Sequence, residues 1–190
     1  MEELINMLNS IYPLGEELKK HLLNMLQCRQ LREGEYLLKA GRICENVYFV
    51  KNGLLRSFYK DKRDKEINFW FMSRGDVVYA IRSFLDQTPS MEFIQTLQDT
   101  TVYYISYKEL QNTFKHHIAF NIHGRILTEK YYKLSVEREE IMRMPDAVDR
   151  YNYLVEHFPD LMNVVPDKYL ATFIRMTPVT ISRLRTQRFK

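Results

Sequence analysis

The stretch of sequence from Lys168 to Lys190, KYLATFIRMTPVTISRLRTQRFK, carries the clearest structural signal in the chain. Its first part, 168–174, has apolar residues on one side and is predicted to form a short amphipathic helix. A second helix is predicted over 178–188, because Thr177 is a suitable N-cap and Pro178 is favoured at the first helical position.

The two predicted helices are spaced as in a helix-turn-helix. A small residue, Ala171, is placed where the helices would cross, and the apolar residues Ile181 and Leu184 follow ten and thirteen positions later. The turn has Arg175 where Gly is usual, and a non-Gly residue at positive φ costs about 1 kcal/mol. The same helix pair also occurs in ordinary all-α packing, so the pattern leaves that alternative open.

The second helix has another face, opposite its apolar one. That face carries Val179, Ser182, Arg183 and Arg185. Small side chains, hydroxyl groups and arginine suit the major groove of DNA, where arginine can donate two hydrogen bonds to guanine.

Positive charge is concentrated in the same segment. The net charge of the chain is +4, whereas residues 1–167 hold 22 basic and 24 acidic residues. From position 168 onward there is no acid, and the six basic residues are Lys168, Arg175, Arg183, Arg185, Arg188 and Lys190. This asymmetry is expected of a polyanion-binding segment, although a solvated tail would look alike.

Upstream, the segment 30–107 has short β-rich runs punctuated by four of the six glycines. The predicted strands are 35–38, 47–50, 54–59, 67–72, 93–97 and 101–106. Asn52-Gly53 is a hairpin signal, and the six charged residues 60–65 are predicted to form a solvated hairpin loop. Many short strands at regular spacing indicate a small antiparallel β-barrel or jelly roll.

Helices are predicted on both sides of this segment. Residues 1–27 show helical periodicity with a break at Tyr12-Pro13, and residues 114–144 are predicted to form one long helix. An apolar stripe repeats every seven residues along the long helix, through Phe120, Leu127, Leu134 and Ile141, with Tyr131 on the same side. Such a stripe favours a homodimer joined through this helix, and the alternative is a helix packed on its own barrel.

The predicted class is therefore α+β, in three parts. An N-terminal antiparallel β-barrel or jelly roll covers 1–113, a dimerisation helix covers 114–144, and an all-α helix-turn-helix domain covers 145–190.

Composition narrows the functional classes. No apolar run approaches the roughly 20 residues of a membrane-spanning helix, and the first residues are acidic, unlike a signal peptide. The two cysteines, Cys28 and Cys44, are too few for a disulfide framework or an iron–sulfur cluster. No nucleophile elbow, phosphate-binding Gly loop or metal-ligand spacing occurs. A cytoplasmic protein that is not an enzyme, binds no membrane and needs no metal or cofactor is predicted.

Several short motifs follow one another in a specific order. They are Gly34–Gly41, Tyr48–Gly53, Arg74–Val78, Ser106–Leu110, Asp149–Tyr151 and Met176–Leu184. Together they resemble the Crp/Fnr family of transcriptional regulators, over nearly the whole chain. The resemblance implies a cyclic-nucleotide-binding-like sensor domain, a long dimer helix and a C-terminal helix-turn-helix.

The resemblance also implies how DNA would be bound. A homodimer would read a pseudo-palindromic promoter in double-stranded DNA, with RNA polymerase as a further partner. The implied DNA-binding residues are Lys168, Thr177, Pro178, Val179, Thr180, Ser182, Arg183, Arg185 and Arg188. Among these, Val179 stands where many members carry a Glu that reads cytosine, so a different half-site is expected. The chain ends just after this helix, so the usual β-hairpin wing is not expected.

The implied effector pocket lacks the residues that hold a cyclic nucleotide. Its residues are Tyr79, Ala80, Arg82, Ser83, Phe84, Ser90 and Met91. Ala80 replaces the Glu of the ribose site, and Ser90-Met91 replaces the Arg-Ser pair that holds the cyclic phosphate. Cyclic-nucleotide binding is not expected, and the effector is left open. The alternative function is a sensor or interaction module whose helix-turn-helix is structural.

Overall fold

The computed structural model describes the backbone of residues 1–188 and the side chains of residues 1–186. The chain divides into two compact units, one made of 1–57 and 71–129 and the other of 58–70 and the chain from 130 onward. The expected boundaries at 113 and 144 were placed where the pattern of residue types changes along the sequence. The two units are instead defined by which residues contact one another. Within residues 1–188, no helix is both long enough and apolar enough to cross a membrane.

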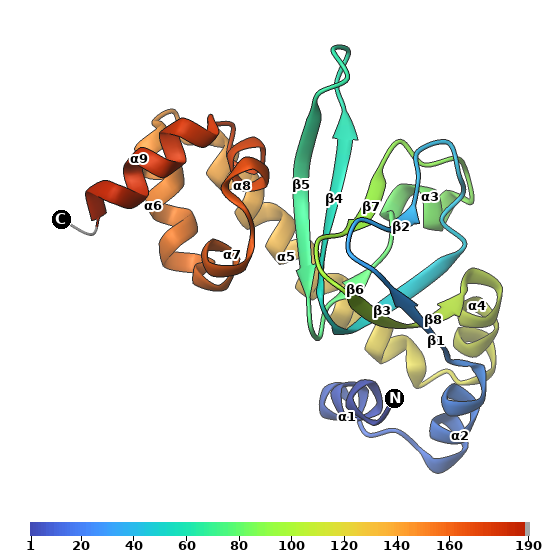
Figure 1. Ribbon diagram of the computed structural model, residues 1–190. Coiled ribbons are helices and arrows are strands. Elements are labelled where there is room, and N and C mark those ends of the chain that lie inside the picture. The colour runs from blue at the N-terminus through green and yellow to red at the C-terminus, as the bar shows by residue number, and fades with distance from the viewer. Residues whose placement is uncertain (189–190) are drawn as a thin grey trace. The chain divides into compact units, whose positions relative to one another are not determined.

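The predicted mixed α+β class is confirmed, with a jelly-roll arrangement of two four-stranded sheets (Figure 1). One sheet has the order β1 (Gln27–Leu31), β8 (Thr100–Ser106), β3 (Asn46–Asn52) and β6 (Val77–Val78). The other has the order β2 (Tyr36–Leu38), β7 (Phe93–Thr96), β4 (Leu54–Lys60) and β5 (Glu66–Ser73). The strands β1 and β6 and the short helix α3 (Ile81–Asp86) were not expected from the sequence.

Both expected hairpin turns are present. Gly53 lies between β3 and β4 with φ of 106°, and a Cβ at this position would lie 2.7 Å from the Cα of Thr100. Only glycine fits there. In the loop between β4 and β5, the Asp61 carboxylate accepts hydrogen bonds from the backbone N–H groups of Arg63 and Lys65, at 2.8 and 3.0 Å. This Asx-type turn stabilises the charged loop, as expected of aspartate at a turn.

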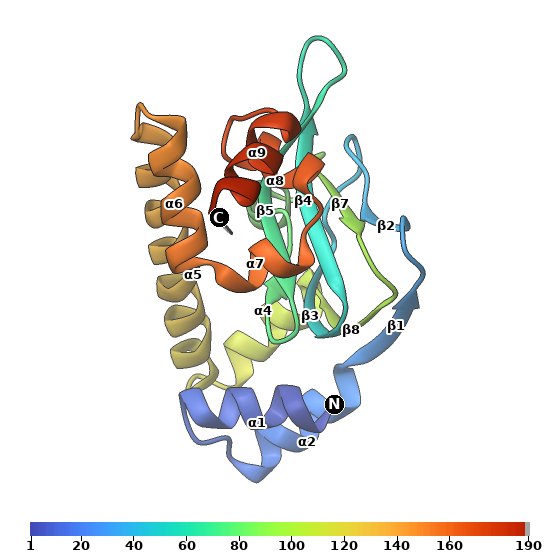
Figure 2. The same ribbon diagram turned by 60° about the vertical axis from the view of Figure 1, so that its left-hand side comes forward.

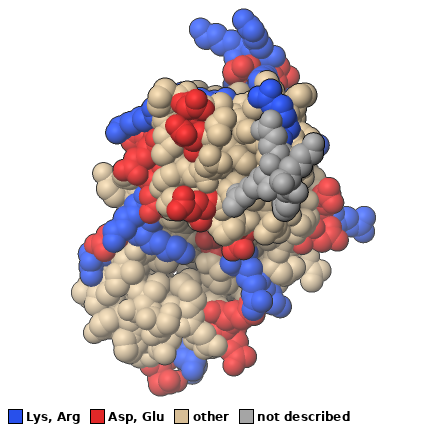
Figure 3. Space-filling view, turned by 90° about the vertical axis from the view of Figure 1, so that its left-hand side faces the viewer, with Lys and Arg blue, Asp and Glu red and all other residues tan. Residues whose placement is uncertain are grey.

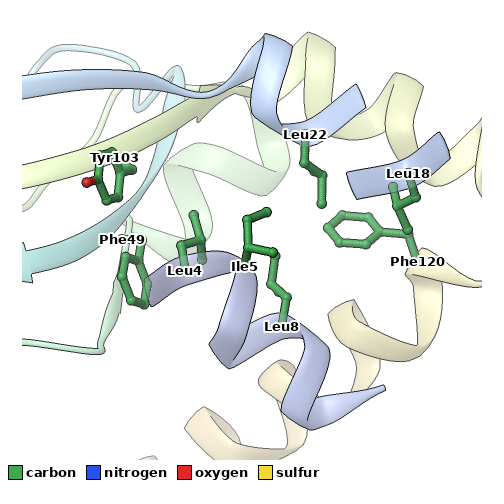
Figure 4. Close-up of a cluster of buried hydrophobic side chains, with 8 residues drawn as sticks. All are labelled: Leu4, Ile5, Leu8, Leu18, Leu22, Phe49, Tyr103 and Phe120. Atoms are coloured by element: carbon green, nitrogen blue, oxygen red, sulfur yellow. The ribbon is translucent and has the colours of Figure 1, made fainter. Parts of the chain in front are cut away.

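The N-terminal helices α1 (Glu2–Ile11) and α2 (Glu16–Met25) pack against the first sheet and against the start of α5 (Phe120–Arg143). Figure 2 shows both helices at the end of the first unit where α5 begins. The cluster that joins these elements consists of Leu4, Ile5, Leu8, Leu18, Leu22, Phe49, Tyr103 and Phe120 (Figure 4).

The long helix is shorter than expected. Helix α4 (Tyr107–His116) starts with a capping box between Ser106 and Glu109 and ends at His116, so α5 begins only at Phe120 and has 24 residues. Gly124 makes room for the Phe114 ring, because a Cβ on Gly124 would lie 2.9 Å from its Cζ atom. The chain therefore bends between two helices where the sequence predicts one.

The expected seven-residue stripe faces its own chain at both ends. Phe120 is buried in the N-terminal cluster of the first unit, and Ile141 is fully buried in the second unit. Leu127 packs against the N-terminal cluster, while Tyr131 and Leu134 are half-buried. Along these residues the helix thus forms intrachain contacts, the alternative that the periodicity left open.

Up to residue 188, the second unit contains four further helices: α6 (Ala147–His157), α7 (Pro159–Val164), α8 (Asp167–Phe173) and α9 (Pro178–Arg188). Asp146 caps α6, since its carboxylate accepts from the N–H of Val148 at 2.6 Å. Residues 159–164 form a short helix, and Pro159 stands at its first position, where a missing N–H is tolerated. The core of this unit includes Tyr151, Leu154, Leu170, Ile174 and Ile181.

Candidate nucleic-acid interface

The helix-turn-helix lies in the second unit and is formed by α8 and α9. In the turn, the N–H of Met176 donates to the carbonyl oxygen of Ala171 at 2.7 Å, and Arg175 has φ of 56°. This is a Schellman motif, in which glycine usually takes the left-handed position. The turn therefore keeps its ordinary geometry despite the arginine, at a cost of about 1 kcal/mol.

Helix α9 has one buried and one exposed face. Ile181 and Leu184 are buried against the unit. The Oγ1 atom of Thr177 accepts from the N–H of Thr180 at 3.2 Å, which caps the helix as expected. The exposed residues of the opposite face include Pro178, Val179, Ser182 and Arg183. Val179 is 79% exposed.

Arg185, another expected DNA-binding residue, is instead bonded inside the unit. Its guanidinium lies 3.0 Å from the carboxylate of Asp167 and donates to the carbonyl oxygen of Met162 at 2.6 Å. The side chain is about one-third exposed. Arg185 thus fixes α9 to α7 and to the first residue of α8, and it is not available at the outer face.

The remaining expected residues occupy varied positions. Lys168 is exposed, with its ammonium group 4.7 Å from the centre of the Tyr169 ring. Thr180 is half-buried and shares a hydroxyl hydrogen bond with Thr177 at 2.8 Å. The side chain of Arg188 and all of Lys190 lie outside the described residues. Basic and acidic side chains are intermixed on the face of the described residues shown in Figure 3.

Two residues that the sequence did not single out hold the first helix of the pair in place. Asn68, on β5, is buried, and its Nδ2 atom donates to Oγ1 of Thr172 at 2.7 Å and to the carbonyl oxygen of Tyr169 at 3.3 Å. The Arg138 guanidinium lies over two rings, 6.0 Å from that of Phe69 and 5.4 Å from that of Phe173. Burial lowers the pKa of Arg138.

These contacts join the tip of the β4–β5 hairpin, the end of α5 and α8 into one unit. A hydrogen bond of Asn68 bridges 104 residues of sequence, which explains why periodicity could not reveal it. A cavity of about 640 Å³ adjoins the same region, lined by Tyr59, Asp61 and Lys65 of the hairpin and by Thr172, Arg175 and Thr177 of the helix pair.

One known domain family matches part of the chain. Residues 28–117 match the cyclic nucleotide-binding domain. No curated protein matches the chain in sequence.

Solved structures match over most of the chain. FixK2 from Bradyrhizobium japonicum superimposes with a TM-score of 0.72 at 17% identity, over 85% of this chain and 83% of that one. A putative Crp/Fnr-family regulator from Eubacterium rectale has a TM-score of 0.72 at 14% identity, over 92% and 85%. A CooA mutant from Carboxydothermus hydrogenoformans has a TM-score of 0.67 at 20% identity, over 87% and 77%. The chain has the Crp/Fnr fold. The fold that the motif resemblance implied is thereby confirmed.

In this Crp/Fnr fold, the residues expected to form an effector pocket do not form a polar cradle. Ala80 and Phe84 are buried, and Tyr79 contacts the ring of Phe84. Ser83 accepts from the N–H of Cys44 at 2.9 Å and donates to the carbonyl oxygen of Thr88. The hydroxyls of this region are therefore used in local hydrogen bonds.

The other members of the expected pocket are either exposed or bonded locally. Arg82 is exposed beside Asp86, and Met91 is 78% exposed. The Oγ atom of Ser90 accepts from the N–H of Glu92 at 2.9 Å. Burial raises the pKa of Glu92 to about 7. When ionised, a carboxyl group next to this site disfavours an anionic ligand. The sequence motifs gave no indication of this group.

The structure shows no metal site of ordinary composition within residues 1–188, since no three His, Cys, Asp or Glu side chains gather there. His123 is buried, and its Nε2 atom lies 3.1 Å from the carbonyl oxygen of Leu8 and 3.0 Å from that of Tyr12. Cys44 is buried, and its Sγ atom accepts from the N–H of Ala80 at 3.4 Å. Both residues serve local packing.

Proposed function

We propose that this chain is a DNA-binding transcriptional regulator of the Crp/Fnr type that acts in the cytoplasm as a homodimer. The observation that carries the proposal is the outer face of α9, where Pro178, Val179, Ser182 and Arg183 are exposed on a helix anchored by Ile181 and Leu184. This arrangement presents arginine, hydroxyl and methyl groups to a major groove.

The four residues differ in what they can read. Arg183 can donate two hydrogen bonds to guanine, and Ser182 can bond to several bases. Val179 can contact the methyl group of thymine but cannot accept a hydrogen bond from cytosine. The proposed half-site therefore has a guanine opposite Arg183 and a thymine near Val179.

Arg185 has a different proposed role. Its ion pair with Asp167 fixes the angle of α9, so its contribution to DNA binding is through position. Lys168 and Thr177 remain candidates for phosphate contacts, which supply affinity without sequence selectivity.

The proposed dimer forms through α5. Phe120 and Ile141 are buried within their own chain, which leaves the half-buried Leu127, Tyr131 and Leu134 and the exposed face of the helix. On that exposed face, Tyr132 is 69% exposed and Val136, one turn later, is also exposed. A second copy of α5 that covers these residues would bury both side chains.

The barrel is proposed to regulate DNA binding without cyclic nucleotide. The absence of an Arg-Ser pair, the local bonding of Ser83 and Ser90, and the carboxyl group of Glu92 all disfavour a cyclic phosphate. RNA polymerase is proposed as a partner at the promoter, as the Crp/Fnr resemblance implies.

The proposal is tested by capture of fragmented genomic DNA on the purified chain at physiological salt, followed by sequencing. Salt matters because contacts to phosphate alone weaken steeply as it rises. Wild type is compared with Arg183→Ala and with a control, Arg74→Ala, which removes an exposed arginine of the first unit that pairs with Glu3.

We expect an enriched palindrome that is lost with Arg183→Ala and retained with Arg74→Ala. Loss of specific affinity should amount to about 1–3 kcal/mol. If no sequence is enriched, even after cell extract is added to supply an effector, the helix pair is structural and the chain is an interaction module.

A further inference from the structure

A second cavity lies in the first unit, apart from the residues that the Crp/Fnr resemblance assigns to an effector. It has a volume of about 310 Å³ and is formed by β1, β2, the start of β3 and the loop 39–45. Its polar lining includes Arg29, Lys39, Arg42, Glu45 and Tyr48. None of the residues from Tyr79 to Met91 lines it. Its size is at the lower end of small-molecule sites.

The lining is strongly basic. Three cationic side chains, from Arg29, Lys39 and Arg42, border the cavity with a single acidic one, from Glu45. Across the described part of the chain, none of the three cations forms an ion pair or a side-chain hydrogen bond, and Lys39 makes only a cation–π contact with Tyr36, at 5.1 Å. Like charges gathered around one cavity repel each other, so a bound anion would relieve that repulsion.

The floor of the cavity adds a neutral hydrogen-bond donor. Tyr48 is buried, and its hydroxyl oxygen accepts from Nδ2 of Asn46 at 3.3 Å. Burial raises the pKa of Tyr48, so the hydroxyl keeps its proton and can donate it to an acceptor in the cavity. Leu37, Leu38 and Ile43 supply an apolar wall beside these polar groups.

We propose that this cavity binds a small organic phosphate monoester, with the dianionic phosphate between Arg29, Arg42 and Lys39 and the organic part against Leu38 and Ile43. Two arginines favour a phosphate because each can donate paired hydrogen bonds to its oxygens. The volume exceeds that of a bare phosphate ion, so an organic group fits beside it.

The site also has a physical link to the segment around α3. Cys44 lines the cavity, its N–H donates to Oγ of Ser83, and its Sγ atom accepts from the N–H of Ala80. These two hydrogen bonds connect the loop 39–45 to the first turn of α3. A ligand that shifts this loop would therefore also shift the start of α3.

The test uses phenyl phosphate as the probe, with inorganic phosphate and benzoate as comparisons, and measures heat of binding by calorimetry on the full chain at physiological salt. The site variant is Arg29→Gln with Arg42→Gln, and the matched control is Arg74→Gln, an exposed arginine of the same unit that does not line the cavity. Circular dichroism confirms that each variant is folded.

We expect saturable binding of phenyl phosphate by wild type and the control. The affinity should be at least about tenfold lower in the site variant, because that variant lacks both charged guanidinium groups. Tyr48→Phe should weaken binding to a smaller extent. Inorganic phosphate should compete weakly and benzoate should bind least.

Three results would overturn the proposal. They are no binding of phenyl phosphate to wild type, equal binding by wild type and the site variant, and binding of benzoate as strong as that of phenyl phosphate. The test does not involve DNA, so its outcome is independent of the proposed function.

Discussion

The Nδ2 atom of Asn68 lies 2.7 Å from the Oγ1 atom of Thr172, and this hydrogen bond joins β5 to the first helix of the helix-turn-helix. The backbone N–H of Asn68 donates to the same oxygen at 3.2 Å. A buried amide with such partners is costly to remove, because the groups that it satisfies lose their hydrogen bonds away from water.

Replacement of Asn68 by alanine should therefore destabilise the second unit by about 1–3 kcal/mol. Urea unfolding followed by circular dichroism measures the change. Asn152→Ala, at an exposed position of α6, is the matched control and should have little effect. Equal stability of the two variants would show that the hairpin does not support α8.

Substitutions of Arg183 and Arg185 should differ in their effect on the free energy of unfolding. Arg185→Ala removes an ion pair and a charged hydrogen bond inside the unit and should cost about 1–2 kcal/mol of unfolding free energy, whereas Arg183→Ala should change it by less than about 0.5 kcal/mol. Urea titration of both variants measures this. A reversed order would mean that the roles assigned to the two arginines are exchanged.

The turn at Arg175 can be made less strained. Glycine at this position should raise the unfolding free energy by about 0.5 kcal/mol, because it removes the left-handed penalty of about 1 kcal/mol while it adds freedom to the unfolded chain. Arg175→Ala keeps the penalty and loses only the charge, so it should give no such gain. Thermal and urea unfolding of the two variants decide the point.

Glu92 should make stability depend on pH. Its pKa is raised from 4.5 to about 7, so the folded state binds more protons than the unfolded state between these values. Stability from this group is complete below pH about 4.5 and is lost as pH rises through about 7. The unfolding free energy of Glu92→Gln minus that of wild type should rise across this range, and a flat difference would contradict the assignment.

If the dimer forms through the exposed face of α5, substitutions on that face should halve the mass of the particle in solution. Tyr132→Glu with Val136→Glu should give monomers by sedimentation, because two carboxylates would be buried in the interface. Val148→Glu, at an exposed valine of α6, should stay dimeric. A dimer that persists here but dissociates with Leu127→Asp and Leu134→Asp would place the interface on the other side of α5.

Much of the architecture follows from local signals in the sequence. Thr177, Pro178 and the Ile181–Leu184 spacing predict α9, and Asn52-Gly53 predicts the turn after β3, because caps and tight turns are decided by neighbouring residues. The strands β1 and β6 escaped prediction. β1 is exposed at four of its five residues, and β6 has only two residues, so neither shows periodicity.

The candidate site was harder to predict, because its geometry depends on partners far apart in the sequence. Arg185 pairs with Asp167 and is therefore not free to contact DNA. Phe120 and Ile141 are buried, so both ends of the seven-residue stripe face their own chain. The contact of Asn68 with Thr172 has no local signature at all. Charge and periodicity identify such residues as candidates, and only the folded chain shows which groups they meet.

Strand β4 begins and strand β5 ends in the first compact unit, whereas residues 58–70 between these points belong to the second. No single cut in the chain separates these units, because removal of everything after Glu129 would remove Thr172 and Arg138, which contact Asn68 and Phe69. An exchange of C-terminal segments between such regulators by gene fusion must therefore carry a matching hairpin tip with it, so the two parts are expected to change together during evolution.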